Sequence, residues 1–538
     1  MEDRDDNKKI IIPENTDLNN LSIEPKVVEN IIDDKTLMGR AIQNEPTLKK
    51  ILDNITPLDF VDIASKGRAS LLRKKMFDTK DQTLKEKLEK EIKGYEPDED
   101  SKNVIVMEGL LNVANDLGTG LIMTNSTSYF YNGHYWERIH VNVLANFLGS
   151  VAEKTGIPWL KARQHKMQDK LLKQFTTTAA FKEPEIKDGE IKINLLDGTY
   201  CINHNKEGEL GELRTAKKED FFKYQLPFGH DPRAQAKLFI KYLNQVLPDV
   251  SAQMVLMEYI AYIFTKMKLE KTLFLYGLGA NGKSVFFEII TALLGESNVS
   301  HYPMDRLLDP NGYTRAMIEN KLVNYCPELG GIKDIQLFKR LSSGEPVDAR
   351  LPYGEPFILK NYGKLIFNTN DLPQAEQTEA FFRRPIIIHF NQTIPESERD
   401  INLAKKIIDT ELSGIFNIVL KSLDRLVKQG GFTKSAFIDE QLLNYKKESN
   451  SVAQFLENEQ WVKSSTNNIA LKDFYPHYVF YCKHMGLIPV GSSKFSSRLR
   501  MLGYKVDKAK QGGYFHVWCE MKIDDDFMDM SVIKSIIQ

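Results

Sequence analysis

The sequence has little cysteine and no long apolar segment. Its four cysteines lie far apart in the chain, and none forms a C-x-x-C pair. This spacing argues against a zinc ribbon and against a disulfide framework, and it fits a reducing cytoplasm. No run approaches the ~18 apolar residues that a membrane span needs, and the polar start MEDRDDNKK is not a secretory signal. We expect a cytoplasmic protein without a membrane partner.

The chain also lacks an excess of either charge. Lys plus Arg number 72 and Asp plus Glu number 73, so there is no overall basic field to attract nucleic acid. Any such contact would need a local patch or a lined channel. Internal repeats and low-complexity tracts are absent from the sequence. With 538 residues, 42% of them hydrophobic, the chain has the composition of a soluble protein with several domains.

The most informative stretch is Leu273–Ser284, with the sequence LFLYGLGANGKS. An apolar run typical of a strand ends at Gly277. The eight residues Gly277–Ser284 match the pattern G-x-x-x-x-G-K-[ST], and the last three of them are Gly282, Lys283 and Ser284. An amphipathic helical pattern comes directly afterwards. The alternative is an ordinary glycine-rich turn between a strand and a helix, but the context is the one that a phosphate-binding loop requires.

The chemistry of such a loop follows from its residue types. Gly277, Gly279 and Gly282, together with Asn281, allow successive backbone N–H groups to turn inward around a phosphate, and the helix N-terminus adds its dipole. Lys283 would reach the β- and γ-phosphates, and the Ser284 hydroxyl would hold Mg²⁺. The sequence therefore predicts ATP and Mg²⁺ as cofactors.

Two later strands end in polar side chains. The apolar strand 321–327 leads to Glu328, and the strand 364–369 leads to Asn370. A carboxylate in the first position can orient Mg²⁺ and polarise the attacking water. An amide in the second can hydrogen-bond the γ-phosphate or that water. Either residue alone means little, because strands often end in polar residues.

Arg383 and Arg384 stand directly before another apolar strand, Ile386–Phe390. Adjacent arginines at such a place usually form surface ion pairs. In a ring-shaped ATPase, this is where an arginine finger projects into the nucleotide of the neighbouring subunit.

The order of these motifs resembles superfamily 3 helicases, and in particular the poxvirus-type and phage or plasmid primase–helicase group. The segment Lys339–Arg350, K-x-L-S-S-G-E-x-V-x-A-R, is similar to that group's motif between the second and third ATPase strands. The resemblance implies an α/β fold with an AAA+-like phosphate-loop NTPase motor. It also implies a homo-hexameric ring that pulls single-stranded DNA through its pore with ATP.

The resemblance also implies residue roles. Lys283 and Ser284 would bind phosphate and Mg²⁺, Glu328 would be the catalytic acid and a metal ligand, and Asn370 would be the sensor. Arg384 would be the arginine finger, with Arg383 in reserve. A DNA-gripping hairpin would precede the sensor strand, and Arg350 and Tyr353 are the nearest candidates for contacts to phosphate and base. The alternative for that stretch is an ordinary turn.

The sequence departs from the group in two places. Many members carry adjacent acidic residues on the second strand, but here Pro327 precedes Glu328, so the second protein ligand of Mg²⁺ is left open. Relatives often carry an N-terminal primase domain, and residues 1–102 are too short and featureless for one. We therefore expect a helicase part without primase activity, working with a possible separate primase.

The pattern along the chain predicts five regions. Residues 1–103 are polar and partly helical or flexible, with a linker at Gly94–Lys102. An α+β accessory domain with an aromatic hairpin at 129–136 would precede the motor. The predicted boundaries are 1–103 for the N-terminal region, 104–250 for the accessory domain, 251–432 for the ATPase, 433–522 for a winged helix and 523–538 for a tail.

The predicted winged helix has a basic third helix over 492–503. Its apolar residues fall on one face, which turns Lys494, Arg498 and Arg500 outward. These side chains could contact duplex DNA, mostly at phosphates, with the helix in the major groove. The alternative is a winged helix that is used only for protein contacts.

The sequence thus favours an ATP-dependent replicative DNA helicase of a phage, plasmid or mobile element, in the cytoplasm of a bacterium or other host cell. Its 3'-5' polarity is implied by the family alone. An RNA-directed translocase of the same fold is one alternative. Another is an origin-binding initiator or loader that uses ATP for assembly, with the winged helix supplying the function.

Overall fold

The computed structural model describes most of the chain as two compact units, residues 1–185 and 186–538, and each unit is described by itself. The predicted contact residue Tyr353, the N-terminal residues 1–44 and the tail 523–538 lie outside the described residues. None of the described helices is long and apolar enough to span a bilayer. The described ranges are 45–124, 126–184, 189–203, 211–352, 354–373, 378–487, 489–508 and 513–522.

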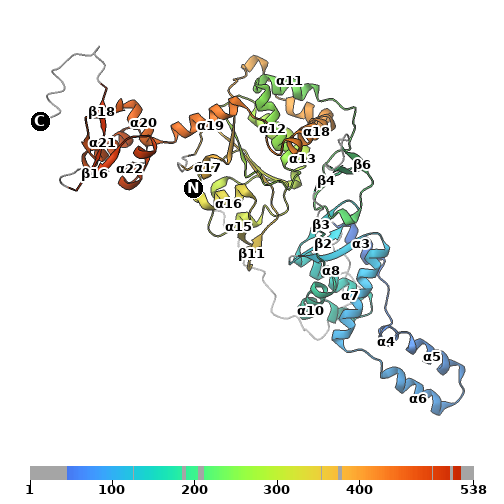
Figure 1. Ribbon diagram of the computed structural model, residues 1–538. Coiled ribbons are helices and arrows are strands. Elements are labelled where there is room, and N and C mark those ends of the chain that lie inside the picture. Colours follow the sequence, from blue (N-terminus) through green and yellow to red (C-terminus); the bar gives the residue numbers. More distant parts are fainter. Residues whose placement is uncertain are drawn as a thin grey trace, which may run out of the picture. The chain divides into compact units, whose positions relative to one another are not determined.

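The first unit packs helices against a small antiparallel sheet. Helices α5 and α6 lie side by side as a helical hairpin (Figure 1). The sheet has the strand order β1-β2-β3, and the hairpin of β2 and β3 was predicted correctly: Tyr131 lies opposite Trp136, around a turn that contains Asn132 and Gly133. The elements are α3 (Pro46–Asp53), α4 (Phe60–Ala64), α5 (Arg68–Asp78), α6 (Gln82–Lys93), α7 (Glu99–Asp116), β1 (Gly120–Thr124), β2 (Thr127–Tyr131), β3 (Trp136–Ile139), α8 (Val141–Lys154), α9 (Trp159–Ala162) and α10 (His165–Thr178).

The predicted linker at Gly94–Lys102 is wrong in its second half. Asp98 caps α7 by accepting a hydrogen bond from the Ser101 N–H, and the helix then continues to Asp116. Acidic residues in the first turn are favourable because they face the positive end of the helix dipole. The expected boundary between residues 103 and 104 therefore falls inside a helix.

The second unit begins with elements that were expected to belong to a separate accessory domain. The antiparallel sheet contains β4 (Glu190–Leu195), β5 (Gly198–Asn203) and β6 (Glu212–Arg214), and helices α11 (Lys237–Val246) and α12 (Val250–Tyr262) follow. Buried residues of these elements share one apolar core with the large sheet of this unit. The predicted accessory domain 104–250 is therefore divided between the two units, because β4, β5 and α11 bury their apolar faces in the second.

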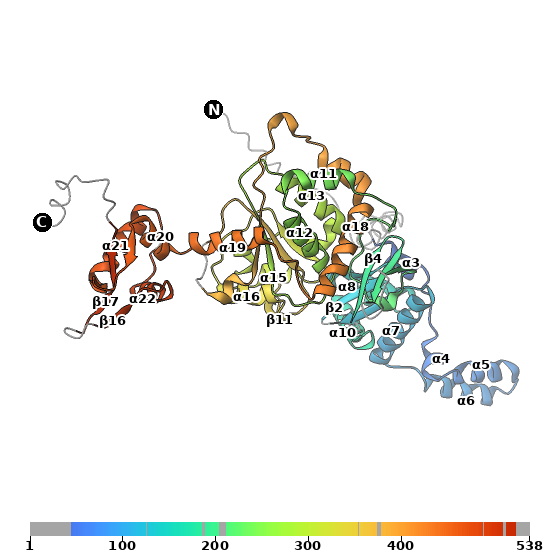
Figure 2. The same cartoon turned by 45° about the horizontal axis from the view of Figure 1, so that its top comes forward.

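A five-stranded parallel sheet forms the centre of the second unit, in the order β13-β7-β12-β9-β8. Alternate residues of β7 enter different cores: Leu273 and Leu275 pack with α11, α12, α13 and α18, whereas Phe274 packs with α14, α16, α17 and α19. Helices therefore cover both faces (Figures 1 and 2). The elements are β7 (Thr272–Tyr276), α13 (Lys283–Leu294), β8 (Val299–Ser300), α14 (Met304–Leu307), β9 (Val323–Cys326), α16 (Ile335–Ser343), β12 (Lys364–Thr369), α17 (Glu379–Phe382), β13 (Pro385–His389), α18 (Leu403–Gln429) and α19 (Ala436–Glu448).

The predicted winged-helix region 433–522 does not form one domain over its whole length. Helix α19 packs on the large sheet through Tyr445, whereas a separate aromatic core begins at Val452. Three helices and short antiparallel strands surround that core, and the winged helix stays a prediction. The elements are α20 (Ser451–Asn458), β14 (Trp461–Lys463), β15 (Ile469–Ala470), α21 (Leu471–His484), α22 (Ser492–Met501), β16 (Val506–Lys508), β17 (Phe515–Val517) and β18 (Cys519–Met521).

Candidate nucleotide site

The segment Gly277–Gly282 joins the carboxyl end of β7 to the N-terminus of α13, so the predicted strand and helix on either side of it are confirmed. β7 lies between β12 and β13, while β8 and β9 lie beyond β12. After β7 the chain forms β8 and β9 on one side of it. It then adds β12 next to β7 on that side and β13 next to β7 on the other side. Ligands of open α/β sheets bind outside the carboxyl ends of the strands at such a switch point.

Two glycines of the loop are required by their surroundings. Gly277 has a φ of +150°, and a Cβ there would lie 2.5 Å from both the Asn281 Nδ2 and the Phe390 carbonyl oxygen. Gly282 has a φ of +88°, and its Cβ would lie 2.7 Å from a methyl group of Val246. Gly279 has open space around it. The loop is therefore tightly held at its two ends and accessible in the middle, as a phosphate cradle must be.

Lys283 occupies the interior of the loop. Its buried ammonium donates hydrogen bonds to the carbonyl oxygen of Gly277, to the Asn281 Oδ1 at 3.2 Å and to the Leu278 carbonyl oxygen at 3.4 Å. Burial lowers the pKa of Lys283 from its ordinary value. The Asn281 amide in turn donates to the Phe390 carbonyl oxygen at 3.0 Å, which ties the loop to the end of β13.

Helix α11 supports the loop from behind. The buried Tyr242 hydroxyl donates to the Gly282 carbonyl oxygen at 2.8 Å. The N-terminus of α11 is held by Glu411 of α18, whose carboxylate accepts hydrogen bonds from the N–H groups of Leu238 at 2.8 Å and Phe239 at 2.9 Å. Tyr242, which precedes Gly282 by 40 positions, therefore fixes the backbone of the motif.

The register of the sheet brings Glu328 and Asn370 to the same edge as the loop. Cys326 of β9 pairs with Phe367 of β12, and Thr369 of β12 pairs with Tyr276 of β7. Neighbouring strands are about 4.8 Å apart, so the chain after β9 lies about 10 Å from the chain after β7. Ser284, Glu328 and Asn370 are all exposed there. The structure thus gathers these three predicted site residues, and their catalytic roles stay predictions.

Tyr276 and His389 were not among the predicted site residues. Their rings lie 4.7 Å apart between centroids, at the ends of the paired strands β7 and β13. Burial lowers the pKa of His389, and the nearby charge of Lys283 lowers it further. Both residues end a strand that flanks the loop, which is the sequence signal that would have pointed to them.

Arg383 and Arg384 lie at the opposite, amino edge of the sheet, directly before β13. The Arg384 guanidinium is buried and donates to the Ser343 hydroxyl at 3.2 Å and to the Lys339 carbonyl oxygen at 3.3 Å. Arg383 has 55% of its side chain exposed and pairs with Glu270 at 2.6 Å. The preference for Arg384 as the projecting arginine therefore does not fit this chain, because the end of α16 encloses its side chain. A finger role for Arg383 stays a prediction.

The predicted DNA contacts differ in their settings. Arg350 ends β10 (Val347–Arg350), which pairs with β11 (Pro356–Leu359), and its exposed side chain donates to the Gly354 carbonyl oxygen at 2.9 Å. On α22, Lys494 and Arg500 are exposed as expected. The expectation that Arg498 also turns outward is wrong, since it is half-buried and burial lowers its pKa.

Within the described residues, no group of three or more His, Cys, Asp or Glu side chains is placed to hold a metal ion. Ser284 and Glu328 stay the predicted Mg²⁺ ligands, and a further protein ligand stays open. A small protein ligand set of this kind is usual for Mg²⁺ in phosphate-binding sites.

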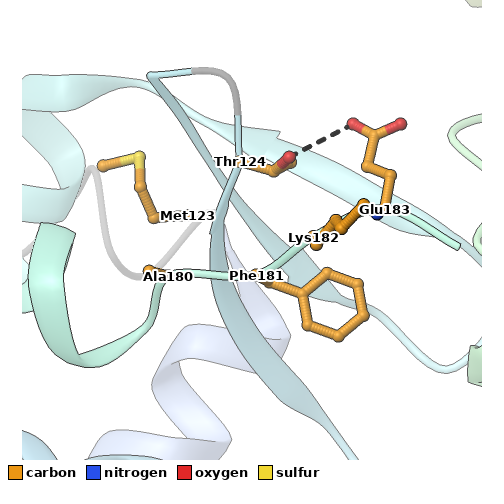
Figure 3. A pocket seen from close by; sticks show the side chains of 6 residues that line it. All are labelled: Met123, Thr124, Ala180, Phe181, Lys182 and Glu183. Carbon is orange, nitrogen blue, oxygen red and sulfur yellow. Dashed lines mark hydrogen bonds between the residues drawn. The ribbon is translucent and has the colours of Figure 1, made fainter.

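The first unit contains a wide, open hollow of about 540 Å³, lined by residues 123–124 and 180–183 (Figure 3). Among its lining residues, the Thr124 hydroxyl and the Glu183 carboxylate are 3.4 Å apart, and Lys182 supplies the cation. The hollow has neither a glycine loop nor a helix N-terminus. Its size alone does not make it a nucleotide site.

Two segments of the chain match known families. Residues 118–248 match a family described as D5 N terminal like, and residues 275–384 match a family of unknown function, DUF5906. The first match ends ahead of the loop, and the second spans the loop, Glu328 and Asn370. The D5 N terminal like match supports a relation to the primase–helicase group.

Solved structures of the NrS-1 C terminal region are similar to this chain at low identity. The A form apo structure of that region shares 13% identity, covers 76% of this chain and 98% of its own, and gives a TM-score of 0.45. A second apo structure of the region shares 14% identity, covers 79% of this chain and 100% of its own, and gives a TM-score of 0.42.

Proposed function

We propose that this protein is an ATP hydrolase that drives translocation on single-stranded DNA, as the helicase of a phage, plasmid or mobile element. The observation that supports it best is the Gly277–Ser284 loop at a switch point of a parallel sheet, with Glu328 and Asn370 at the same edge. The D5 N terminal like match lies ahead of the loop. The resemblance to superfamily 3 helicases predicts an accessory region in the same place, so the two agree.

The residues of the loop fit a nucleoside triphosphate. In the proposed site, backbone N–H groups of the loop and of the start of α13 donate to the phosphate oxygens of ATP. Lys283 exchanges its bonds to Gly277, Leu278 and Asn281 for bonds to these oxygens. The exchange favours ATP because a charge-assisted bond to phosphate is stronger than a bond to a neutral carbonyl oxygen.

Glu328 is the proposed base. Its exposed carboxylate follows β9 and accepts a proton from the attacking water, while the Asn370 amide orients that water or the γ-phosphate. Ser284 and Glu328 are the residues that would hold Mg²⁺, which supplies charge stabilisation for the transferred phosphoryl group when bound. Arg383, exposed at the amino edge, would act on the nucleotide of a neighbouring copy in a homo-hexameric ring.

The test is ATP hydrolysis by the full chain, with and without single-stranded DNA, in the wild type and in Lys283→Ala. Strong stimulation by DNA that disappears in the variant supports a motor. Hydrolysis that ignores nucleic acid overturns the translocase and points to the initiator or loader, which would also bind duplex of a specific sequence after loss of Lys283. Stimulation by RNA oligonucleotides but not by DNA would identify an RNA-directed translocase instead.

The ring is tested by mixing two inactive variants. Arg383→Ala and Lys283→Ala subunits each lack one half of a site shared between copies, so a mixed ring would contain some complete sites. Recovery of hydrolysis on mixing supports action in trans. The matched comparison mixes Arg384→Ala subunits with Lys283→Ala subunits. If hydrolysis recovers in that mixture but not in the mixture with Arg383→Ala, Arg384 is the finger.

A further inference from the structure

The hairpin of β16 and β17 carries two exposed aromatic side chains at its tip. Tyr514 is 58% exposed and Phe515 is 39% exposed. The Lys472 ammonium lies 4.8 Å from the Tyr514 ring centroid. The Arg500 guanidinium and the Lys508 ammonium lie 5.6 and 5.7 Å from the Phe515 ring centroid. We call this group of five residues the hairpin-tip cluster.

The sheet brings the members of the cluster together. Lys508 of β16 lies directly opposite Phe515 of β17 in the antiparallel register. On the other edge of β17, β15 pairs with it and runs straight into α21, which places Lys472 beside Tyr514. Arg500 is held by hydrogen bonds to the Val506 carbonyl oxygen at 3.2 and 3.3 Å. Three elements thus contribute a cation each around two neighbouring rings, Phe515 at the start of β17 and Tyr514 directly before it.

The cations of the cluster are not neutralised by neighbouring acids. In the part of the chain that the structure describes, no carboxylate lies within 4.0 Å of the charged nitrogens of Lys472, Arg500 or Lys508. The nearby Asp507 pairs with Lys505 instead, at 3.8 Å. Three positive charges that lie over two partly exposed rings therefore have no carboxylate partner among the described residues.

We propose that the hairpin-tip cluster binds single-stranded nucleic acid. Bases stack on Tyr514 and Phe515, and Lys472, Arg500 and Lys508 contact the phosphates on either side. Exposed aromatic rings flanked by cations favour a single strand, because the bases of a duplex are stacked on each other and their faces are closed. The site is distinct from the loop at Gly277–Ser284, and the proposal does not depend on ATP hydrolysis.

The first test measures binding of a fluorescent oligo(dT) to the full chain by anisotropy, without nucleotide. Tyr514→Ala should weaken binding roughly tenfold, as expected for one lost base stack, and Tyr514→Phe should bind as the wild type does. Phe480→Ala is the matched control, because Phe480 is 74% exposed on α21 and lies outside the cluster. Equal binding by wild type and Tyr514→Ala would overturn the proposal.

The second test concerns charge. Replacing Lys472 and Lys508 by Gln should make the slope of log K against the logarithm of the salt concentration shallower by about 1.4. This corresponds to about 0.7 for each lost phosphate contact. A control pair, Lys483→Gln with Lys522→Gln, removes the same charge from exposed positions of the same domain that lie outside the cluster. An equal or larger loss in the control pair, or tighter binding of a duplex than of the single strand, would overturn the proposal.

The third test locates the contact. Photo-crosslinking of an iodouracil-containing oligonucleotide should label the peptide that carries Tyr514 and Phe515, and labelling confined to other peptides would contradict the proposal. Parallel experiments with oligo(dT) and oligo(rU) show whether the bound strand is DNA or RNA. Wild-type ATP hydrolysis without nucleic acid, measured in parallel, tests the proposed ATPase separately from this site.

Discussion

At the carboxyl edge of the large sheet, Ser284, Glu328 and Asn370 are exposed. At the amino edge, by contrast, polar groups are buried and bonded to one another. The Thr272 hydroxyl donates to the Ser342 hydroxyl at 2.8 Å, and Arg384 donates to Ser343. The serines of the segment Lys339–Arg350 thus hold the strands β7 and β13 where they begin.

The comparison separates two kinds of polar residue that look alike in sequence. Side chains bonded within the chain contribute to folding, and removing one leaves a buried partner unsatisfied. Exposed polar side chains gathered around a glycine loop contribute little to folding and are available to a ligand. The two edges should therefore respond differently to mutation: activity at the carboxyl edge, stability at the buried positions of the amino edge.

Lys283→Ala should give the largest effect. We expect ATP hydrolysis to fall about a thousandfold, because the cation that faces the phosphates is lost. Steady-state hydrolysis measures this, and thermal unfolding is the control. The unfolding midpoint should stay within a few degrees, since burial of an ammonium is itself unfavourable. A loss of folding as severe as the loss of activity would remove the contrast between the edges.

Glu328→Gln should reduce kcat several hundredfold, as expected for loss of a general base. Binding of ATP should persist, because the loop and Lys283 are intact. Single-turnover hydrolysis and equilibrium binding of a fluorescent ATP analogue separate the two effects. Full activity in this variant would exclude Glu328 as the base.

Arg384→Ala should destabilise the fold by about 2 to 3 kcal/mol, because buried acceptors on α16 lose their donor. Arg383→Ala is the matched control and should cost less than about 1 kcal/mol, since its ion pair is exposed. Denaturant unfolding of both variants measures the difference. Equal, small losses would show that Arg384 is not part of the folded framework.

A smaller effect concerns pH at the amino edge. Burial lowers the pKa of Lys364 to about 8, and its ammonium lies 3.9 Å from the Tyr262 ring centroid. Between pH 8 and its ordinary pKa of 10.5, the unfolded chain binds more protons than the folded one, so stability contributed by this group rises with pH. Lys364→Met should reduce the rise between pH 7.5 and 9.5 by about 2 kcal/mol.

Denaturant unfolding at the two pH values measures that change. Lys360→Met is the control, because Lys360 is exposed and lies just ahead of β12 in sequence. The other buried lysines titrate in both variants and cancel in the comparison. An identical pH dependence in the two variants would mean that Lys364 is not desolvated.

Local patterns allowed much of the fold to be predicted. The loop, the strands before Glu328 and Asn370 and the hairpin at Trp136 follow from glycine motifs and from runs of apolar and aromatic residues. The start of α7 carried a signal that was overlooked, namely Asp98 followed by two acidic residues. Its polar composition resembled a linker.

Other features depend on contacts between distant segments. Two adjacent arginines before a strand give no indication of which one is enclosed, because the residues of α16 that enclose Arg384 are 41 and 45 positions away in sequence. The support of the loop by Tyr242 also needed the three-dimensional arrangement. The division of the predicted accessory domain arose in the same way, since an alternating apolar pattern does not say which core receives it.

The bond from Tyr242 to Gly282 has a practical consequence for anyone who wishes to produce the ATPase alone. A fragment that begins at residue 251, where the sequence places the start of the motor, would lack Tyr242 and Val246, which pack against the loop. It would also leave the Glu411 carboxylate without the helix end that it caps. A soluble fragment with a working loop should therefore begin before β4, although such a start lies well inside the segment matched as D5 N terminal like.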